Sequence, residues 1–347
     1  MNPNRPLGIW LAIWAAMLFV LIQIGGATRL TESGLSITEW QPVSGVIPPL
    51  THADWEEEFA RYRQIPQYQA IHADMTLDQF KTIFLWEYTH RLWARLVGVA
   101  FLLPLLWFLF RGMVPRDIRG RLWLLLLLLA AQGALGWFMV SSGLSGRIEV
   151  SQYRLAAHFA AALLIYGATV WTAAGFLASP EAKRADVPAL RRSAATLTGL
   201  AAVTAIAGAF VAGLRGGHVF NTWPLMGGRV VPPGYTMLSP WVRNWFENPG
   251  AAQFDHRCLA YLTVCSVVIF WLISRRHALA KSQRIAVGCF AAAAVGQVCL
   301  GIATLLLIVP VPLGIAHQGG AIILITAGLV ATHGLRGRTD LVLTSGD

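Results

Sequence analysis

The chain has 347 residues, of which 56% are apolar and only 13% are charged. Its mean hydropathy is +0.56. Soluble globular domains are seldom this apolar, so a membrane protein is the first class to consider. The formal net charge is +10, but the basic residues recur in short segments between apolar stretches and form no single basic block. This distribution argues against nucleic acid as the partner and indicates membrane lipid.

Eight apolar stretches are long enough to cross a bilayer. A hydrocarbon core of about 30 Å needs roughly 20 apolar residues in a helix, and backbone groups in lipid must find their partners within the helix. We therefore predict an all-α membrane protein with eight transmembrane helices near Leu7–Ala27, Arg91–Phe110, Leu122–Ser142, Leu155–Ala178, Ala194–Leu214, Arg257–Ser274, Ile285–Ile308 and Leu313–His333.

The charges predict the orientation of these helices. Four basic residues lie in each of the segments 111–121, 183–192 and 275–284, whereas acidic residues such as Glu56 and Glu57 gather in alternate segments. By the positive-inside rule the basic segments are cytoplasmic, and an even helix count then places both termini in the cytoplasm. The first stretch lacks a clear small-x-small site at its end, so we expect a retained helix and not a signal peptide.

Cysteine usage indicates no disulfide framework. All four cysteines lie inside apolar stretches, where they are expected to act as small apolar side chains, and none forms a pair in an outer segment. They are Cys258, Cys265, Cys289 and Cys299.

The sequence repeats itself once, in the same order in both halves. The segment Glu87–Arg91 (Glu-Tyr-Thr-His-Arg) matches Gln253–Arg257 (Gln-Phe-Asp-His-Arg). Further matches pair Gln132–Gly136 with Gln297–Gly301 and His158 with His317. Each half contains four predicted helices, so both halves insert in the same direction. We predict two four-helix bundles arranged as a parallel repeat.

We place the N-terminal half at residues 1–180 and the C-terminal half at residues 181–347. The first half carries a long outer loop over residues 29–86, in which Trp55, Phe59 and Tyr62 share one helical face. Thr76–Gln79 resembles a capping box that opens a further short helix. Two interpretations stay open for this loop, an ordered cap over the first bundle and a membrane-anchoring segment.

Four of the nine histidines lie near the outer ends of predicted spans. An ionisable residue inside a spanning helix is costly and suggests a function. Two facing histidines in a four-helix bundle are typical of bis-imidazole heme iron, whereas zinc usually requires more ligands at short spacing. We expect one pair, His90 and His158, in the first half and another, His256 and His317, in the second. The remaining five, expected to be solvated or interfacial, are His52, His72, His218, His277 and His333.

An arginine follows the first histidine of each half, and in the first half a carboxyl precedes it. Arg91 and Arg257 directly follow His90 and His256, and guanidinium groups suit heme propionates or anchor a helix at the interface. The same two interpretations apply to Arg29 and Arg215, at the ends of the first and fifth predicted helices. Glu87 lies three residues before His90 and thus on the same helix face, where a carboxyl could move protons or stabilise a developing cation.

The first half therefore has an ionisable group that the second half lacks. The residue equivalent to Glu87 is Gln253, which has a similar shape without an acidic proton. This difference predicts that the first half carries out chemistry and that the second half holds a resident heme.

These residues together resemble the heme A synthase family, in its proteobacterial and mitochondrial branch. The resemblance covers nearly the whole chain, including the eight spans, the repeat, the Glu87–Arg91 segment and the four histidines. The stretch from Arg29 to Pro42, with Gly45 and Pro48-Pro49, resembles the first outer loop of that branch. The family's other branch has a cysteine pair in this loop, and this chain lacks it, which puts a thiol–disulfide electron route in doubt.

The resemblance implies an oxidoreductase that converts heme O to heme A for terminal oxidases, by oxidising a porphyrin methyl group to a formyl group. It implies that His90 and His158 hold the iron of the substrate heme O. His256 and His317 would hold a permanent heme b, and Glu87 would be catalytic. It also implies a bacterial inner-membrane location, with a heme O synthase, an electron donor and a second copy of the chain as candidate partners.

Two other functions compete with this one. A di-heme b-type membrane electron-transfer subunit predicts equivalent halves and gives Glu87 no role. A transporter predicts charged or broken helices at the middle of the bilayer. The optical spectrum and mass of the bound hemes would separate the first two.

Overall fold

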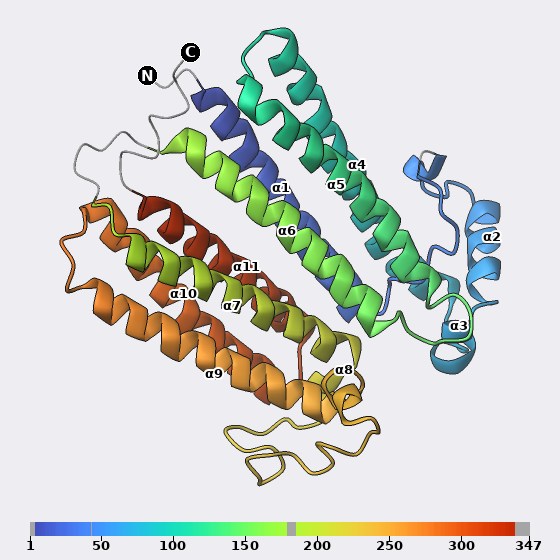
Figure 1. The fold of residues 1–347 in the computed structure, drawn as a ribbon. Coiled ribbons are helices and arrows are strands. Elements are labelled where there is room, and N and C mark those ends of the chain that lie inside the picture. Colours follow the sequence, from blue (N-terminus) through green and yellow to red (C-terminus); the bar gives the residue numbers. More distant parts are fainter. Residues whose placement is uncertain (1–3, 43, 179–184, 337–347) are drawn as a thin grey trace. The chain divides into compact units, whose positions relative to one another are not determined.

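The computed structural model describes residues 4–42, 44–178 and 185–336. These residues form helices and loops without a β-strand, and eight of the helices are long and apolar enough to cross a membrane. This confirms the predicted all-α architecture and helix number. The eight (Figure 1) are α1 (Arg5–Leu30), α4 (Leu77–Phe110), α5 (Arg116–Ser141), α6 (Gln152–Leu177), α7 (Pro188–Gly213), α9 (Pro249–Ser274), α10 (Lys281–Leu306) and α11 (Val311–Gly334).

Helices α4 and α9 begin well before their apolar stretches. The predicted capping box at Thr76 is present, because the Thr76 side chain accepts from the Gln79 N–H and Gln79 bonds back to Thr76. It opens α4 itself, however, so the prediction of a separate short helix is wrong. His90 consequently lies about 20 Å along α4 from its first residue, at 1.5 Å per residue, and not within two turns of the helix start. At α9 the Asn248 side chain caps the helix by accepting from the Gly250 and Ala251 N–H groups.

The chain divides into two compact units. The first unit comprises residues 16–162, and the second comprises residues 1–15 together with residues 163–347. Helices α1 and α6 thus each contribute to both units. The predicted boundary at residues 180 and 181 lies outside the described residues, and the assignment of one heme to each half stays a prediction.

The second unit contains a closed ring of four helices. Along the ring α7 contacts α9, α9 contacts α10, α10 contacts α11, and α11 contacts α7 (Figure 1). Small residues allow this approach: a Cβ on Gly328 of α11 would collide with Thr198 and with the Phe290 ring, 3.0 Å away. Such interdigitation is expected of helices that pack through small residues in a membrane.

The first unit has an ordered cap made from its long outer loop. Helix α2 (His52–Tyr62) begins at a capping box on Thr51, and α3 (Pro66–Ile71) follows it. Phe59 stacks on Phe80 at 4.9 Å, and Trp55 meets Phe84 edge-on at 5.1 Å. Of the two interpretations of this loop, the structure supports the ordered cap, since aromatic side chains of the loop pack on the outer part of α4.

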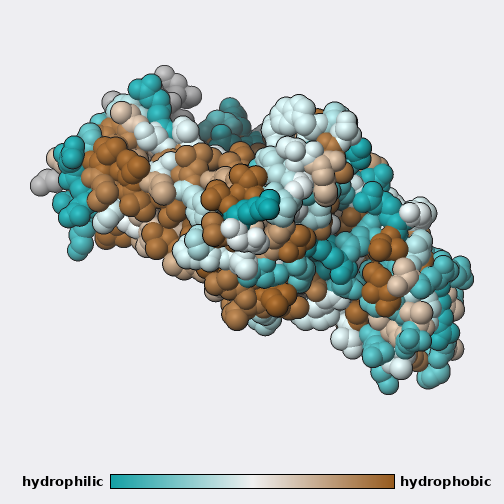
Figure 2. Space-filling model, turned by 90° about the horizontal axis from the view of Figure 1, so that it is seen from below, coloured by the Kyte–Doolittle hydropathy of each residue, from teal (hydrophilic) through white to brown (hydrophobic). Residues whose placement is uncertain are grey.

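Large hydrophobic patches lie on the face of the molecule shown in Figure 2, as lipid-facing helices require. The four cysteines are free and exposed on α9 and α10.

His333 was expected to be solvated or interfacial, but only 4% of it is exposed. It lies in the last turn of α11 and packs edge-on against Trp171 at 5.3 Å.

Candidate functional site

Each of the four histidines expected to bind iron lies against a glycine of a neighbouring helix. A Cβ built on that glycine would lie 3.0 Å or less from the Cε1 atom of the histidine ring. We call these four pairs the glycine–histidine contacts. They are Gly25 (α1) with His90 (α4), Gly136 (α5) with His158 (α6), Gly208 (α7) with His256 (α9), and Gly301 (α10) with His317 (α11).

The second histidine of each half is also held by a glutamine. Gln132 donates from Nε2 to the carbonyl oxygen of His158 at 2.8 Å, and Gln297 donates to that of His317 at 2.9 Å. Each glutamine stands one helical turn before the contacting glycine, so both residues face the histidine. The repeated Gln-x-x-x-Gly pattern is therefore a device that positions one histidine in each half.

The separation of His256 and His317 would suit two imidazoles that bind one iron. Their ring centroids are 6.4 Å apart, and the ring planes cross at 88°. Imidazole–metal bonds are about 2.0–2.1 Å long, so two imidazoles on opposite sides of one ion place their centroids roughly 6 Å apart. His256 Nδ1 lies 3.0 Å from the Thr204 carbonyl oxygen, to which it donates. That bond leaves Nε2 as the free lone pair, so these residues fit a heme iron.

His90 and His158 are half-buried, and each has one buried ring nitrogen, Nδ1. Within the described part of the chain, Nδ1 of His158 has no hydrogen-bond partner; Nδ1 of His90 has none of ordinary geometry, although the Leu21 backbone interacts with this ring. Buried polar atoms are nearly always satisfied, so each such atom calls for an explanation. Two histidines of the first unit are thus incompletely satisfied within the protein, which fits residues that bind a ligand.

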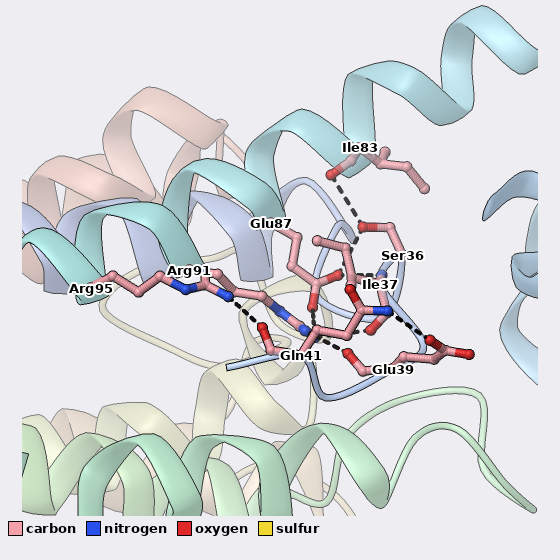
Figure 3. Close-up of polar contacts among 8 residues, drawn as sticks. All are labelled: Ser36, Ile37, Glu39, Gln41, Ile83, Glu87, Arg91 and Arg95. Atoms are coloured by element: carbon pink, nitrogen blue, oxygen red, sulfur yellow. Dashed lines mark hydrogen bonds and ion pairs between the residues drawn. The ribbon is translucent and has the colours of Figure 1, made fainter. Parts of the chain in front are cut away.

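Glu87 is buried in the first unit and is surrounded by donors (Figure 3). Its Oε2 atom accepts from the Ser36 hydroxyl and from the Ile37 N–H, both at 2.8 Å, and its Oε1 accepts from Arg91 Nη2 at 2.7 Å. Its two carboxyl oxygens thus accept from three donors, one of which is charged. The contacts all lie on the side of the outer loop and of Arg91, whereas the sequence predicted a carboxyl directed at the heme edge.

Arg91 and Arg95 fasten the outer loop to α4. Arg91 donates to the carbonyl oxygens of Ile37 and Glu39, both at 2.9 Å, and Arg95 donates to that of Gln41 (Figure 3). Arg95 also donates to the Pro42 carbonyl oxygen. The guanidinium of Arg91 therefore bridges the loop and Glu87. The loop segment that supplies the Ser36 and Ile37 donors is held in place from the same helix that carries the carboxylate.

The second unit repeats this arrangement around an amide. Arg257 donates to the carbonyl oxygens of Phe220 and Thr222 at 2.9 Å, and also to Gln253 Oε1 at 3.2 Å. Gln253 donates from Nε2 to the Gly216 carbonyl oxygen at 2.9 Å. Arg257 Nε is buried and has no partner among the described residues.

Arg29 has a partner of its own in the first unit. It forms an ion pair with Glu149 at 2.9 Å, which ties the end of α1 to the loop before α6. Its predicted counterpart Arg215 has a left-handed backbone with φ of 51° at the end of α7. Helix ends commonly adopt this conformation.

Burial and charge shift the acidity of groups in the outer cap. Burial raises the pKa of Tyr62 well above its usual range, and the negative charges of Glu32 and Glu87 raise it further. The Tyr62 hydroxyl donates to Gln67 Oε1 at 3.0 Å and is hydrogen-bonded to His72 Nδ1 at 2.6 Å. Burial likewise raises the pKa of Glu58. By contrast, hydrogen bonds from the Thr51 and Leu50 backbone lower the pKa of Asp54.

The structure brings together residues that the sequence had predicted separately. Glu87 and Arg91 are in contact, as are Gln253 and Arg257. The roles of Ser36, Ile37 and the four contacting glycines were not predicted from the sequence. The Gln-x-x-x-Gly repeat contained a signal for Gly136 and Gly301, whereas Gly25 and Gly208 lie in stretches that no repeated motif marks.

Comparison with known proteins adds an independent finding. Residues 8–329 match the model of the COX15-CtaA family, described as cytochrome oxidase assembly protein. The chain is 46% identical over 335 residues to the heme A synthase of Nitrosospira multiformis, covering 96% of this chain and 94% of that one. It is 47% identical over 326 residues to that of Parvibaculum lavamentivorans, covering 94% and 93%. It is also 47% identical over 325 residues to that of Rhodopseudomonas palustris strain TIE-1, covering 93% and 87%.

Proposed function

Because this chain belongs to the COX15-CtaA family of cytochrome oxidase assembly proteins, we propose that it is an oxidoreductase that converts heme O to heme A. The relatives reported above are named heme A synthases and align along almost their whole length. In this reaction a porphyrin methyl group of heme O becomes a formyl group, and the product serves terminal oxidases.

One observation supports a reactive first unit above the rest. The buried Glu87 carboxylate lies among three donors on the helix that carries His90, whereas the neutral Gln253 takes the same place on the helix that carries His256. Oxidation of a methyl group releases protons, and a fixed carboxylate can accept a proton or stabilise positive charge that develops on the substrate. We assign Glu87 this catalytic role.

The histidines divide between substrate and cofactor. We assign His90 and His158 to the iron of the substrate heme O, and His256 and His317 to a resident heme b. When bound, heme b would supply one-electron redox chemistry, and the histidines that hold it, with their hydrogen bonds, would tune its potential. The Thr204 carbonyl and Gln297 would orient the two imidazoles that hold it.

Arg91 and Arg257 are candidate partners for heme propionates. Arg257 retains one Nε–H without a partner in the described part of the chain, and a propionate oxygen would satisfy it. Arg91 already donates to two loop carbonyls and to Glu87. Its main role in this proposal is therefore to hold the loop and the carboxylate, with a propionate as an added partner.

The protein is a multi-pass membrane protein with eight spanning helices. We place it in the bacterial inner membrane with both termini in the cytoplasm, on the positive-inside distribution of its basic segments. Heme O is then bound near the outer face. A heme O synthase, an electron donor and a second copy of the chain are candidate partners.

Analysis of the hemes that copurify with the protein tests this function. We expect heme b together with heme O, or with its hydroxylated or formyl derivatives, in the extracted pigment. Heme b alone, at two equivalents per chain, would instead support the di-heme electron-transfer subunit. Loss of one equivalent in a His158→Ala variant and of heme b in a His317→Ala variant would assign the two sites.

A further inference from the structure

We infer that Gly25, Gly136, Gly208 and Gly301 are positioning residues for the iron-binding histidines, each fixing the place of one imidazole by having no side chain. This inference rests on the proposed assignment of the four histidines as heme ligands. Its basis is that every one of these histidines, in both units, makes the same contact with a glycine of a different helix.

The contacts leave too little room for a methyl group unless the ring or its helix moves. A Cβ on Gly301 would lie 2.8 Å from His317 Cε1, and one on Gly25, Gly136 or Gly208 would lie 3.0 Å from the ring it faces. Carbon atoms in van der Waals contact are about 3.5–4.0 Å apart. The ring, or the helix that carries it, would therefore have to move by several tenths of an ångström.

Such a movement matters for a metal ligand. Metal–ligand distances in proteins stay within about 0.2 Å of their usual values. The imidazoles of the second unit are also hydrogen-bonded to the helix that carries the contacting glycine, one turn before it. His256 is bonded to the Thr204 carbonyl, and the Gln297 amide lies against Nδ1 of His317 at 3.2 Å. A ring pushed away from its glycine would therefore lengthen this hydrogen bond and shift relative to the iron.

The glycines of these helices do not all behave in this way. Helices α5, α7 and α10 carry other glycines at which an added Cβ would meet nothing within 4 Å: Gly133, Gly199, Gly288 and Gly296. Their presence shows that a general shortage of space on glycine-rich helices does not explain the contacts. It also supplies control positions on the same helices.

The test compares alanine variants of the full-length, heme-loaded protein. In the second unit, Gly301→Ala is paired with Gly296→Ala, and Gly208→Ala with Gly199→Ala. The readouts are the heme b spectrum and the rate at which heme b transfers to apomyoglobin. Substitutions that disturb the surroundings of metal ligands typically weaken binding by about 10–100-fold. We therefore expect heme b to leave at least about tenfold faster from the two contact variants, with a loss of the low-spin spectrum.

Two alanine variants on the same helices serve as matched controls. The Gly296→Ala and Gly199→Ala variants should retain the spectrum and the transfer rate of the unaltered protein. Should Gly301→Ala fail to accumulate as folded protein, Gly208→Ala, with the slightly longer 3.0 Å approach, provides the measurement. Contact variants that match their controls in both readouts would overturn the inference.

A His317→Ala variant separates this failure from a failure of the proposed function. If that variant keeps the heme b spectrum, the histidine assignment itself is wrong. If it loses heme b while Gly301→Ala and Gly208→Ala behave as their controls do, only the role of the glycines is wrong. The pair Gly136→Ala and Gly133→Ala extends the test to heme O binding in the first unit.

Discussion

Glu87 in the first unit and Gln253 in the second occupy equivalent places, and each accepts a hydrogen bond from the arginine one turn later. Their other oxygen or nitrogen atom differs in its surroundings. Glu87 Oε2 faces two donors, the Ser36 hydroxyl and the Ile37 N–H. Gln253 Nε2 faces two acceptors, the carbonyl oxygens of Gly216 and Phe220.

The loops over the two units therefore cannot be exchanged for one another. Each loop presents the polarity that its own partner requires, so an acid in the first unit and an amide in the second are both supported by the backbone around them. The exchange of one residue would leave donors facing donors or acceptors facing acceptors, which is costly in a buried site. The difference between the units therefore extends from one side chain into the loop structure.

The largest effect is expected when the acid is replaced. Glu87→Gln removes the ionisable group and directs an amide at the Ile37 N–H. We expect heme A formation to fall by about 10²–10⁴-fold, the usual contribution of a general acid–base group, while heme b stays bound. Quantification of extracted hemes by chromatography and mass spectrometry measures both. An unchanged yield of heme A would remove Glu87 from the mechanism.

The reciprocal exchange tests the second unit. In Gln253→Glu a carboxylate would face the Gly216 and Phe220 carbonyls. We expect a loss of stability of about 3 kcal/mol, at the upper end for an unsatisfied buried group. The thermal midpoint for loss of the heme b spectrum should fall accordingly, whereas the heme A synthase activity at low temperature should persist. A midpoint equal to that of the unaltered protein would show that the loop polarity is unimportant.

A smaller effect is expected at Ser36, which supplies one of the three donors to Glu87. A hydrogen bond to a charged group contributes about 1.5–3 kcal/mol, and Ile37 and Arg91 remain in Ser36→Ala. We therefore expect about a tenfold lower rate, at the low end of that range. Ser36→Thr keeps the hydroxyl and should restore the rate; an unaltered rate in Ser36→Ala would argue against the positioning role.

The smallest effect concerns the helix caps of the two outer loops. Asp54 of α2 has a pKa lowered by its hydrogen bonds with the Thr51 and Leu50 backbone. Since the folded-state pKa is below the unfolded one, the stabilisation is present above pH about 4 and is lost as the pH falls through the folded value. Hydrogen exchange should show α2 opening in acid, with no further acid dependence in Asp54→Asn. The α9 cap rests on the amide Asn248, so its first turn should show no such change.

Patterns along the chain were enough to predict the spans, the repeat and the four histidines. Apolar length predicts eight spans because a bilayer has a set thickness. The repeat and the four histidines are visible because the same letters return in the same order. The capping box at Thr76 was also predicted, although the sequence did not reveal that it opens a 34-residue helix, because polar residues outside the bilayer continue α4 beyond the apolar stretch.

The surroundings of the functional side chains depend on the tertiary structure and could not be predicted from the sequence. The donors to Glu87 come from Ser36 and Ile37, which are 51 and 50 residues away along the chain. The contact of Gly208 with His256 joins two different helices, and no repeated motif marks it. Such contacts depend on how helices and loops pack, and packing depends on the shape of both partners at once. A sequence pattern within one segment does not specify the surface against which that segment packs.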